Sequence, residues 1–423
     1  MERRTFIKGA AALSSMVILK PGTVFGSRAN SAVQLGIIGC GDRGTAVISS
    51  MSKHTNINIV AMADLLPDKL QKAKATLDKL NADKGFPAIQ KGSMYQGSRA
   101  YLQLLQNRNV DAVLISSPAY THPEFMEAAV AAGKHVYCEK PVAPDVDGCK
   151  RVERVGESVQ GRVSVVVGFQ IRHATPYVEM VKRIQRGDIG DVLNAQLYYF
   201  SSEIQLKPYS DIPYDEARIR NHFHFRDLSG GILLDQGIHM IDVCNWALQG
   251  HPLSAIGTGS NNRGAEFGDA WNNYQAIYEY PNGTHVSFHC SQIGKQFGDV
   301  CARFIGTKGI AEAHYSGGVF ITGDNAWDSG VLRQEAKVTP EQQAAGIFLS
   351  SLHDADANKE KAFINSIQSG NYLNETRSGS RSTLSAILGR QAAEGAKRVS
   401  WEEMIFSNEK IDHHLDLQQF DKA

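Results

Sequence analysis

The sequence lacks an excess of charge of either sign. Its 44 Lys and Arg residues balance 44 Asp and Glu residues among 423, and no block of like charges supplies the basic surface that nucleic-acid binding requires. A charged fraction of 21% is also too ordinary for a disordered chain. We therefore expect a globular protein that acts on small molecules and not on nucleic acid, and the length favours two domains.

Metal-type cysteine spacing is also missing. The six cysteines show no C-x-x-C pattern, so we expect no metal site. Most of them lie in apolar stretches, which predicts buried thiols and does not indicate disulfides, although the even number allows them. The cysteines stand at positions 40, 138, 149, 244, 290 and 301.

No apolar run is long enough to span a bilayer, but the first residues resemble an export signal. Arg3-Arg4-Thr5-Phe6-Ile7-Lys8 is a twin-arginine pattern, and a mildly apolar run from Gly9 to Leu19 follows it. We predict that residues 1–32 are a twin-arginine signal peptide and that the folded protein is exported to the periplasm. We expect no membrane anchor after the signal is removed. An ordinary basic N-terminus before a surface helix is the alternative.

A glycine motif follows at once. Val33–Ile38 is an apolar, β-branched run that predicts a strand, and Thr45–Met51 has helical character. Between them stands a G-x-G-x-x-G pattern in the setting that dinucleotide binding requires. Its first glycine permits a tight turn, its second lets the backbone approach a pyrophosphate, and its third lets helix and strand pack closely. The motif comprises Gly39, Cys40, Gly41, Asp42, Arg43 and Gly44.

The next apolar segments extend this pattern. The predicted strand Ile57–Ala63 ends in Asp64, about 20 residues beyond the glycines, where a carboxylate suits a ribose diol and repels a 2′-phosphate. We therefore expect NAD rather than NADP, and a helix-cap or turn role for Asp64 is the alternative. Further strands at Ala112–Ser116 and His135–Cys138, alternating with helices, predict a doubly wound parallel sheet.

These motifs together resemble the Gfo/Idh/MocA oxidoreductases (glucose-fructose oxidoreductase and inositol dehydrogenase are members). The resemblance rests on G-C-G-D-R-G, S-S-P-A-Y-T-H, A-G-K-H-V-Y-C-E-K-P-V-A and G-G-I-L-L-D-Q-G-I-H-M-I-D. It implies an NAD-binding Rossmann domain over 33–160 and a C-terminal α/β domain over 161–370 with an open, mostly antiparallel sheet. It also implies a helical segment over 371–423 that returns to the first domain, and a homo-oligomer formed through the outer face of the second sheet.

The same resemblance implies a coenzyme site. Besides the six residues of the glycine motif, the site residues it implies are Asp64, Ser117, Pro118, His122, Glu139 and Lys140.

The second half of the sequence fits this arrangement. Val163–Phe169 predicts a strand that opens the second domain, and Pro281-Asn282-Gly283 predicts a hairpin turn. Residues 201–228 look like an irregular loop. Further strands are expected at 193–200, 273–280, 284–290 and 300–305, and helices at 177–186, 361–369 and 382–396.

Three residues are the catalytic candidates. Lys140 follows a strand at the carboxyl edge of the parallel sheet, and Asp235 and His239 share one face of a helix predicted from Ile232 to Leu248. The resemblance implies that His239 is the general base, that Lys140 binds the reacting hydroxyl, and that Asp235 orients His239 or binds a neighbouring hydroxyl. On spacing alone, an Asp/His pair is more often a surface pair.

Three more polar residues are candidates for substrate contact. Arg172 follows the strand ending at Phe169, and His222 and His224 stand in the irregular loop. Their hydrogen-bonding groups suit a polyhydroxylated ligand, although structural roles fit them equally well. No third ligand accompanies the two histidines at a recognisable spacing, so we do not expect them to hold a metal.

The compartment constrains the reaction. An exported enzyme meets little free NAD, so we expect a coenzyme that is held tightly and recycled in place. We predict an NAD-dependent oxidoreductase that acts on a sugar or sugar derivative by hydride transfer. The alternative is a redox-neutral NAD-dependent glycosidase that acts through a transient keto-sugar and elimination. A sugar-binding protein without activity is disfavoured because Lys140, Asp235 and His239 are all retained.

Overall fold

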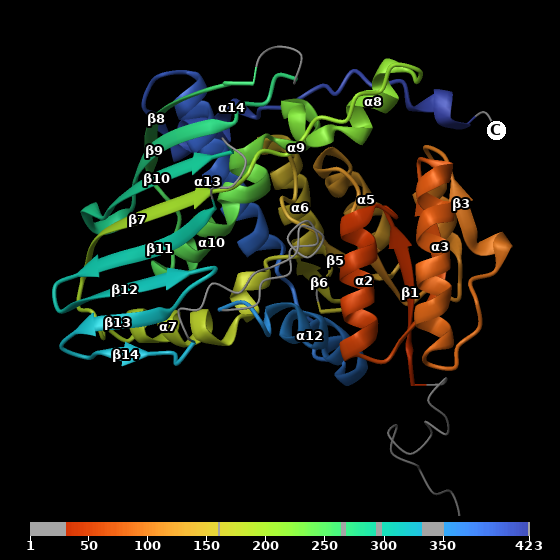
Figure 1. Cartoon of the computed structure of the whole chain (residues 1–423), viewed down its shortest axis with the longest axis horizontal. Helices are drawn as coiled ribbons and strands as arrows, with labels where there is room; N and C mark the ends of the chain where they lie inside the picture. Colours follow the sequence, from red (N-terminus) through yellow and green to blue (C-terminus); the bar gives the residue numbers. More distant parts are fainter. Residues whose placement is uncertain (1–30, 160, 264–267, 293–297, 332–350, 422–423) are drawn as a thin grey trace, which may run out of the picture.

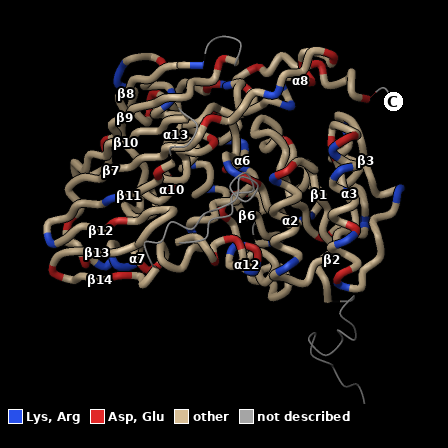
Figure 2. The backbone as a smooth tube through the Cα atoms, viewed as in Figure 1, with Lys and Arg blue, Asp and Glu red and all other residues tan. Residues whose placement is uncertain are grey.

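The computed structural model describes residues 31–159, 161–263, 268–292, 298–331 and 351–421. It contains two α/β units side by side, a parallel sheet with its helices and a larger, mostly antiparallel sheet (Figure 1). Almost all of the predicted signal segment lies outside the described residues. Acidic and basic residues are interspersed along both units (Figure 2), in keeping with the balanced composition. None of the described helices combines the length and the apolar character that crossing a membrane requires.

The first sheet is the predicted doubly wound sheet. Its six strands run in the order β3-β2-β1-β4-β5-β6, and all are parallel. The chain starts in the middle and winds outward in both directions, so the loops that follow β1 and β4 diverge and leave a crevice at the carboxyl ends. The strands are β1 (Val33–Ile38), β2 (Ile57–Asp64), β3 (Met94–Gln96), β4 (Ala112–Ile115), β5 (His135–Cys138) and β6 (Val165–Val167).

The sixth strand corrects one prediction. The run Val163–Phe169 does not open the second domain, because β6 pairs in parallel with β5, with Val165 opposite Val136. The first domain therefore extends beyond residue 160. A continuous apolar run predicts a strand with both faces buried, but such a strand fits either sheet. The sequence therefore does not indicate which of the two sheets Val163–Phe169 joins.

Helices cover both faces of this sheet, and some of them come from the C-terminal end of the chain. α12 packs against α2, and α13 packs against α6, so the return to the first domain begins before residue 371. The helices concerned are α2 (Asp42–His54), α3 (Pro67–Ala82), α4 (Ala100–Gln106), α5 (His122–Ala131), α6 (Val146–Val159), α12 (Ala355–Ser369) and α13 (Thr376–Glu394).

The second sheet is open and mostly antiparallel, as predicted. Its described strands run in the order β14-β13-β12-β11-β7-β10-β9-β8-β15, and only β7 and β10 are parallel. Asn282 and Gly283, with φ of 65° and 74°, form the predicted turn between β9 and β10. The strands are β7 (Val192–Phe200), β8 (Ser254–Ser260), β9 (Asn273–Glu279), β10 (His285–Ser291), β11 (Asp299–Gly306), β12 (Gly309–His314), β13 (Val319–Gly323), β14 (Trp327–Asp328) and β15 (Val399–Ser400).

One face of this sheet packs on α7 (Thr175–Gln185), α10 (Ile238–Ala247) and α13. Alternate residues point the other way, and among them the directly paired Ile256 and Ile277 are 45% and 51% exposed. We call this second side the outer face. The six cysteines are all buried and free, which confirms the prediction of buried thiols.

The segment 201–228 is less irregular than predicted. It contains the short helices α8 (Tyr214–Arg220) and α9 (Arg226–Ser229), separated by a 3-10 turn at His222–His224. Each helix is two turns or less, which is too short for hydrophobic periodicity to reveal.

Candidate active site

A cavity of about 1300 Å³ lies at the carboxyl ends of β1, β2, β4 and β5. Its floor comes from the loops of the first domain, and its other walls come from the second domain and from the C-terminal residues. This is the crevice that the doubly wound topology creates.

The glycine motif has the geometry of a phosphate-binding turn. Gly39 has φ of 93°, and a Cβ on it would lie 2.6 Å from the backbone of Ser116. A Cβ on Gly44 would lie 2.2 Å from the Gly39 carbonyl oxygen, so α2 packs closely on β1. No atom lies within 4 Å of the place where a Cβ on Gly41 would stand. That open space at the N-terminus of α2 fits a pyrophosphate.

Asp64 lies at the end of β2, at the cavity wall. Its carboxylate accepts hydrogen bonds from the backbone N–H groups of Cys40 at 2.6 Å and Leu66 at 2.9 Å. It thus shapes the turn, while each oxygen keeps a lone pair for a ribose hydroxyl. Burial raises the pKa of this carboxyl group. The residues present fit a dinucleotide with a free ribose diol.

Most of the predicted coenzyme residues line the cavity, but two do not. The Cys40 thiol is buried away from it, 3.6 Å from the carbonyl oxygen of Ala63, and Gly44 packs against Gly39. Both therefore shape the turn from behind. His122 lines the cavity, yet both of its ring nitrogens contact carbonyl oxygens, those of Ser117 and Pro141. The predicted residues that line the cavity are Gly39, Gly41, Asp42, Arg43, Asp64, Ser117, Pro118, His122, Glu139 and Lys140.

Lys140 is held where β5 ends. Its ammonium group donates to the backbone oxygen of Asp235 and lies 3.3 Å from Oδ1 of the same residue. The neighbouring Glu139 pairs with Arg43 of the glycine motif at 3.1 Å. Burial opposes the ionisation of Glu139, but the positive charges of Arg43, Lys359 and Lys140 outweigh it and lower the pKa of this carboxyl group. This ion pair joins the glycine motif to the segment that carries Glu139 and Lys140.

The predicted helix from Ile232 to Leu248 is not regular at its start. Leu233–Gly237 form a π-helical turn that carries Asp235, and α10 begins only at Ile238. Gly230 and Gly231, both with φ of 81°, precede this turn. Turns of this kind occur often at functional sites, and no sequence period reveals them.

His239 lies in an aromatic surrounding. It is 8% exposed, and its ring centroid is 6.3 Å from each of those of Phe169, Tyr199 and Tyr315. Burial, together with the charges of Lys140, Arg43 and Lys359, lowers its pKa well below the ordinary value. The imidazole is therefore neutral at neutral pH and able to accept a proton.

Asp235 pairs with Lys140 and not with His239. Among the described residues, no hydrogen bond joins the Asp235 carboxylate to the His239 ring, although both side chains line the cavity. The geometry therefore does not provide one of the two roles predicted for Asp235, the orientation of the His239 imidazole. The carboxylate positions the ammonium group instead.

The three candidates for substrate contact have different positions. His222 lines the cavity, and its Nδ1 is 3.1 Å from the carbonyl oxygen of Ile219. Arg172 is outside the lining and pairs with the buried Asp242 through two contacts of 2.8 Å. His224, 1% exposed, contacts Arg263 at 3.1 Å. Arg172 and His224 thus serve internal partners, which lie 70 and 39 residues away and could not be predicted from spacing.

Sequence reasoning missed two groups of lining residues. Tyr199 and Tyr315 reach the cavity from the second sheet, and residues 410–415 and 417 reach it from the C-terminal end. The aromatic residues resemble ordinary core positions. The C-terminal stretch carries a weak signal: the apolar residues Ile411, Leu415 and Leu417 are an even number of positions apart, which suits an extended segment with one covered side, although His413 interrupts the pattern.

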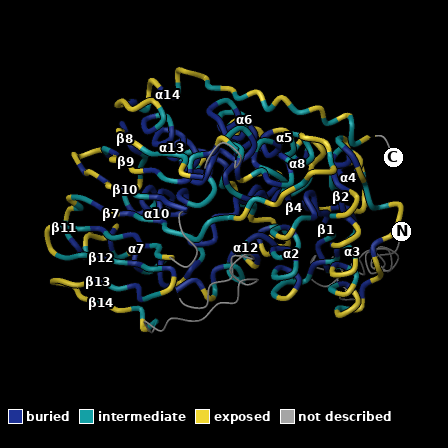
Figure 3. Tube along the Cα trace, turned by 45° about the horizontal axis from the view of Figure 1, so that its top comes forward, coloured by how far each residue is buried: buried dark blue, intermediate teal, exposed yellow. Residues whose placement is uncertain are grey.

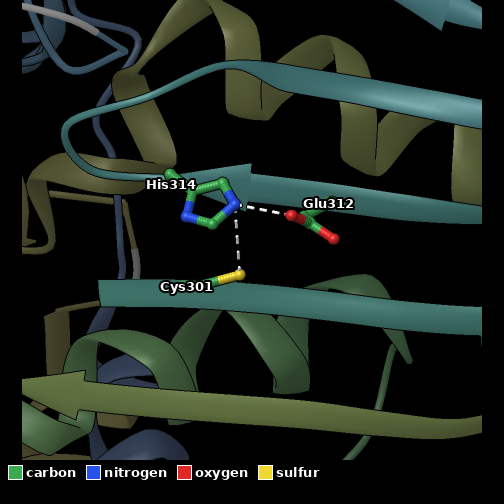
Figure 4. A group of neighbouring side chains, drawn as sticks. All are labelled: Cys301, Glu312 and His314. Carbon is green, nitrogen blue, oxygen red and sulfur yellow. Dashed lines mark hydrogen bonds and ion pairs between the residues drawn. The ribbon is translucent and has the colours of Figure 1, made fainter. Parts of the chain in front are cut away.

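Within the described part of the chain, one cluster has metal-ligand geometry. Atoms of Cys301, Glu312 and His314 lie within 4.8 Å of one another on the outer face (Figure 4). These groups already satisfy each other, since His314 Nε2 is 2.6 Å from Glu312 and the second oxygen of Glu312 accepts from Arg303 at 2.5 Å. A cation there would lie beside a guanidinium group, so the cluster is explained without one.

Comparison with known proteins places this geometry in a family. Residues 33–169 match the oxidoreductase family with an NAD-binding Rossmann fold, and residues 177–312 match the GFO/IDH/MocA C-terminal domain. The myo-inositol 2-dehydrogenase of Thermotoga maritima is 24% identical over 378 residues, which are 88% of this chain and 100% of that protein.

Solved structures show the same fold. Scyllo-inositol dehydrogenase from Lactobacillus casei, with bound NAD(H) and scyllo-inositol, has a TM-score of 0.65 at 22% identity and covers 88% of this chain and 99% of its own. Aldose-aldose oxidoreductase from Caulobacter crescentus, complexed with glycerol, has a TM-score of 0.66 at 18% identity, covering 87% and 99%. The relatives named here are oxidoreductases and give no support to the glycosidase alternative. With its glycine turn, acidic β2 end and two matching domains, the chain belongs to the Gfo/Idh/MocA family and is an NAD-dependent oxidoreductase.

Proposed function

We propose that this protein oxidises a secondary hydroxyl group of a cyclitol or sugar, with Lys140 holding the hydroxyl oxygen and His239 accepting its proton. The observation that carries the proposal is the meeting of Lys140, Asp235 and a neutral, buried His239 in the cavity that the glycine turn opens into. NAD, when bound, supplies the acceptor for the hydride that leaves the carbon atom bearing this hydroxyl group.

The chain's own residues perform the proton chemistry. The ammonium group of Lys140, fixed by the backbone and carboxylate oxygens of Asp235, donates to the substrate oxygen and stabilises the negative charge that develops on it. His239 is neutral before reaction, so its ring accepts the hydroxyl proton. The aromatic side chains around His239 exclude water from the imidazole and fix its plane.

The lining favours a substrate with several hydroxyl groups. Amide, hydroxyl, carboxylate and imidazole groups offer both donors and acceptors without a concentration of one charge, which suits neutral polyols better than acids. The inositol dehydrogenases among the relatives agree with this class. The polar lining residues between positions 170 and 240 include Gln170, Ser201, Glu203, His222 and Gln236.

We also propose that the enzyme is exported by the twin-arginine route and keeps its coenzyme bound. The Arg3-Arg4 motif supports export of a folded protein to the periplasm. Because free NAD is scarce outside the cytoplasm, a coenzyme that stays on the enzyme must be returned to its oxidised form by a second substrate. Association of several copies through the outer face is part of the same proposal.

The test follows the absorbance of the dihydronicotinamide on purified enzyme as cyclitols, free sugars and glycosides are added singly. We expect a lasting rise with a cyclitol or sugar, and loss of the rise in His239→Asn. His285→Asn, an exposed histidine on β10, is the matched control and should behave like the wild type. A rise that decays as an aglycone is released, or full activity in His239→Asn, would overturn the proposal.

A further inference from the structure

The last described residues cross the mouth of the cavity. After α14 (Trp401–Ser407) the chain runs extended and ends in a short 3-10 turn at Leu417–Asp421. In Figures 1 and 3 this segment runs from α14 along one side of the molecule to the far edge of the first domain. We call residues 410–421 the C-terminal tail.

The tail follows the carboxyl edge of the parallel sheet from strand to strand. The backbone N–H of Ile411 donates to Asp145, beyond β5, at 2.8 Å. The His413 ring is 4.8 Å from that of Tyr120, beyond β4. The carboxylate of Asp421 accepts from the backbone and hydroxyl groups of Ser98, beyond β3, at 2.6 and 2.7 Å. The tail therefore passes over the place where a dinucleotide lies in this fold.

One side of the tail faces the cavity. Ile411, His413, Leu415 and Leu417 are half-buried and line it, whereas the residues between them are exposed, although Asp412 and His414 also reach its rim. This alternation is that of an extended chain with one covered side. The half-buried side of the tail thus presents three apolar side chains and one imidazole to the space below it.

The segment 201–228 of the second domain holds the tail in place. Arg218 donates to the carbonyl oxygen of His413 at 3.1 Å, and His413 Nδ1 is 2.8 Å from the carbonyl oxygen of Asp227. The backbone N–H of Asp416 donates to the Asp215 carboxylate at 2.9 Å. The tail is therefore anchored by both domains.

The same segment also grips the first domain directly. Arg220 forms two hydrogen bonds to Asp68, at 2.7 and 2.9 Å, at the start of α3 and just beyond Asp64. At the far end, Gly97 has φ of 104°, and a Cβ on it would lie 2.6 Å from Oδ1 of Asp421. The first domain thus provides a docking place that a larger residue would obstruct.

We propose that the C-terminal tail is part of the dinucleotide-binding site, closing it over the bound coenzyme and retaining it between turnovers. That the retained ligand is NAD rests on the proposed function. Release of the coenzyme then requires the Asp421 to Ser98 contacts and the His413 contacts to open first.

The experiment measures how fast NADH leaves. Enzyme loaded with NADH is mixed with a large excess of NAD, and the loss of bound NADH fluorescence gives the dissociation rate. We expect a chain ending at Lys410 to release NADH at least tenfold faster than the full chain. Asp421→Ala, which frees only the tail's end, should give an intermediate rate and keeps the test valid if the shorter chain does not fold.

Glu402→Ala, which removes an exposed carboxylate from α14 outside the tail, is the matched control and should release NADH at the wild-type rate. Equal rates for the full chain and Asp421→Ala would overturn the tail's role, whether or not the coenzyme is retained. The full chain could be purified without nucleotide while its tail variants still release added NADH faster. That result would refute the tightly bound coenzyme of the proposed function but would support the role of the tail.

Discussion

His239 shows how burial and neighbouring charge set the state of one residue. Its pKa lies well below 6.5 because the ring is desolvated and Lys140, Arg43 and Lys359 are positive. A base of this kind is active when deprotonated, so kcat/KM should remain on its plateau through pH 6.5 and fall only when the pH drops through the lowered pKa. Steady-state rates between pH 4.5 and 8 check this, after correction for unfolding.

An acid limb centred at pH 6.5 or above would contradict this environment for His239. Replacement by Asn, which cannot accept the proton, should lower kcat by about 10²- to 10⁴-fold. NADH binding should change little, because in the proposed mechanism the imidazole contacts the substrate and not the dinucleotide. Equal losses of NADH affinity and kcat would indicate a structural role instead.

At the scale of elements, an ion pair with one buried partner fixes the turn at Gln170–His173 against α10 and α13. Asp242 is 1% exposed and accepts from Arg172 and, at 2.7 Å, from Ser382 of α13. Asp242→Asn leaves the partly exposed guanidinium of Arg172 without its buried counter-charge, so we expect a loss of about 1.5 to 3 kcal/mol in the free energy of unfolding. Urea unfolding of the variant measures it.

The matched control is Arg186→Met, which removes an exposed guanidinium from Asp188 and leaves that carboxylate paired with Arg183, so it should change stability by less than about 1 kcal/mol. The interpretation that Arg172 binds substrate predicts a different result. In that case Arg172→Met would raise KM and leave the unfolding curve unchanged.

Elements with one strong local signal could be predicted from the sequence, and those set by distant partners could not. β1 and β5 were predicted with their observed bounds, because short β-branched or apolar runs bounded by Gly and polar residues specify buried strands. The prediction that β6 opens the second domain is wrong, because its pairing with β5 places it in the first sheet. The π-helical turn before α10 could not be predicted, because it follows neither the 3.6-residue period of an α-helix nor the two-residue period of a strand.

The candidate site divides in the same way. Gly39, Asp64 and Lys140 lie at strand ends or just beyond them, and the topology of a doubly wound sheet brings such positions together. Tyr199, Tyr315 and the C-terminal tail come from the second domain or the chain end. Their position depends on how the two domains are oriented, which no local pattern encodes.

At the scale of the whole molecule, the outer face of the second sheet is the surface that we propose joins copies of the chain. Ile256 and Ile277 stand opposite each other on β8 and β9 and are about half exposed, although both are large and apolar. Burying such a pair against a second copy removes apolar area from water, and a charge placed there would have to be desolvated. Ile277→Lys should therefore shift the enzyme to a single chain in size-exclusion chromatography with light scattering.

Tyr214→Lys changes a large residue on α8 that is even more exposed and lies away from this sheet, and it should leave the assembly intact. The cavity is lined by both domains of one chain, so the dissociated Ile277→Lys variant should still bind NADH. Its unfolding temperature should be lower than that of the wild type, because association no longer stabilises the folded chain. A wild-type enzyme that already elutes as a single chain, or an assembly that survives Ile277→Lys and fails with Tyr214→Lys, would move the interface elsewhere.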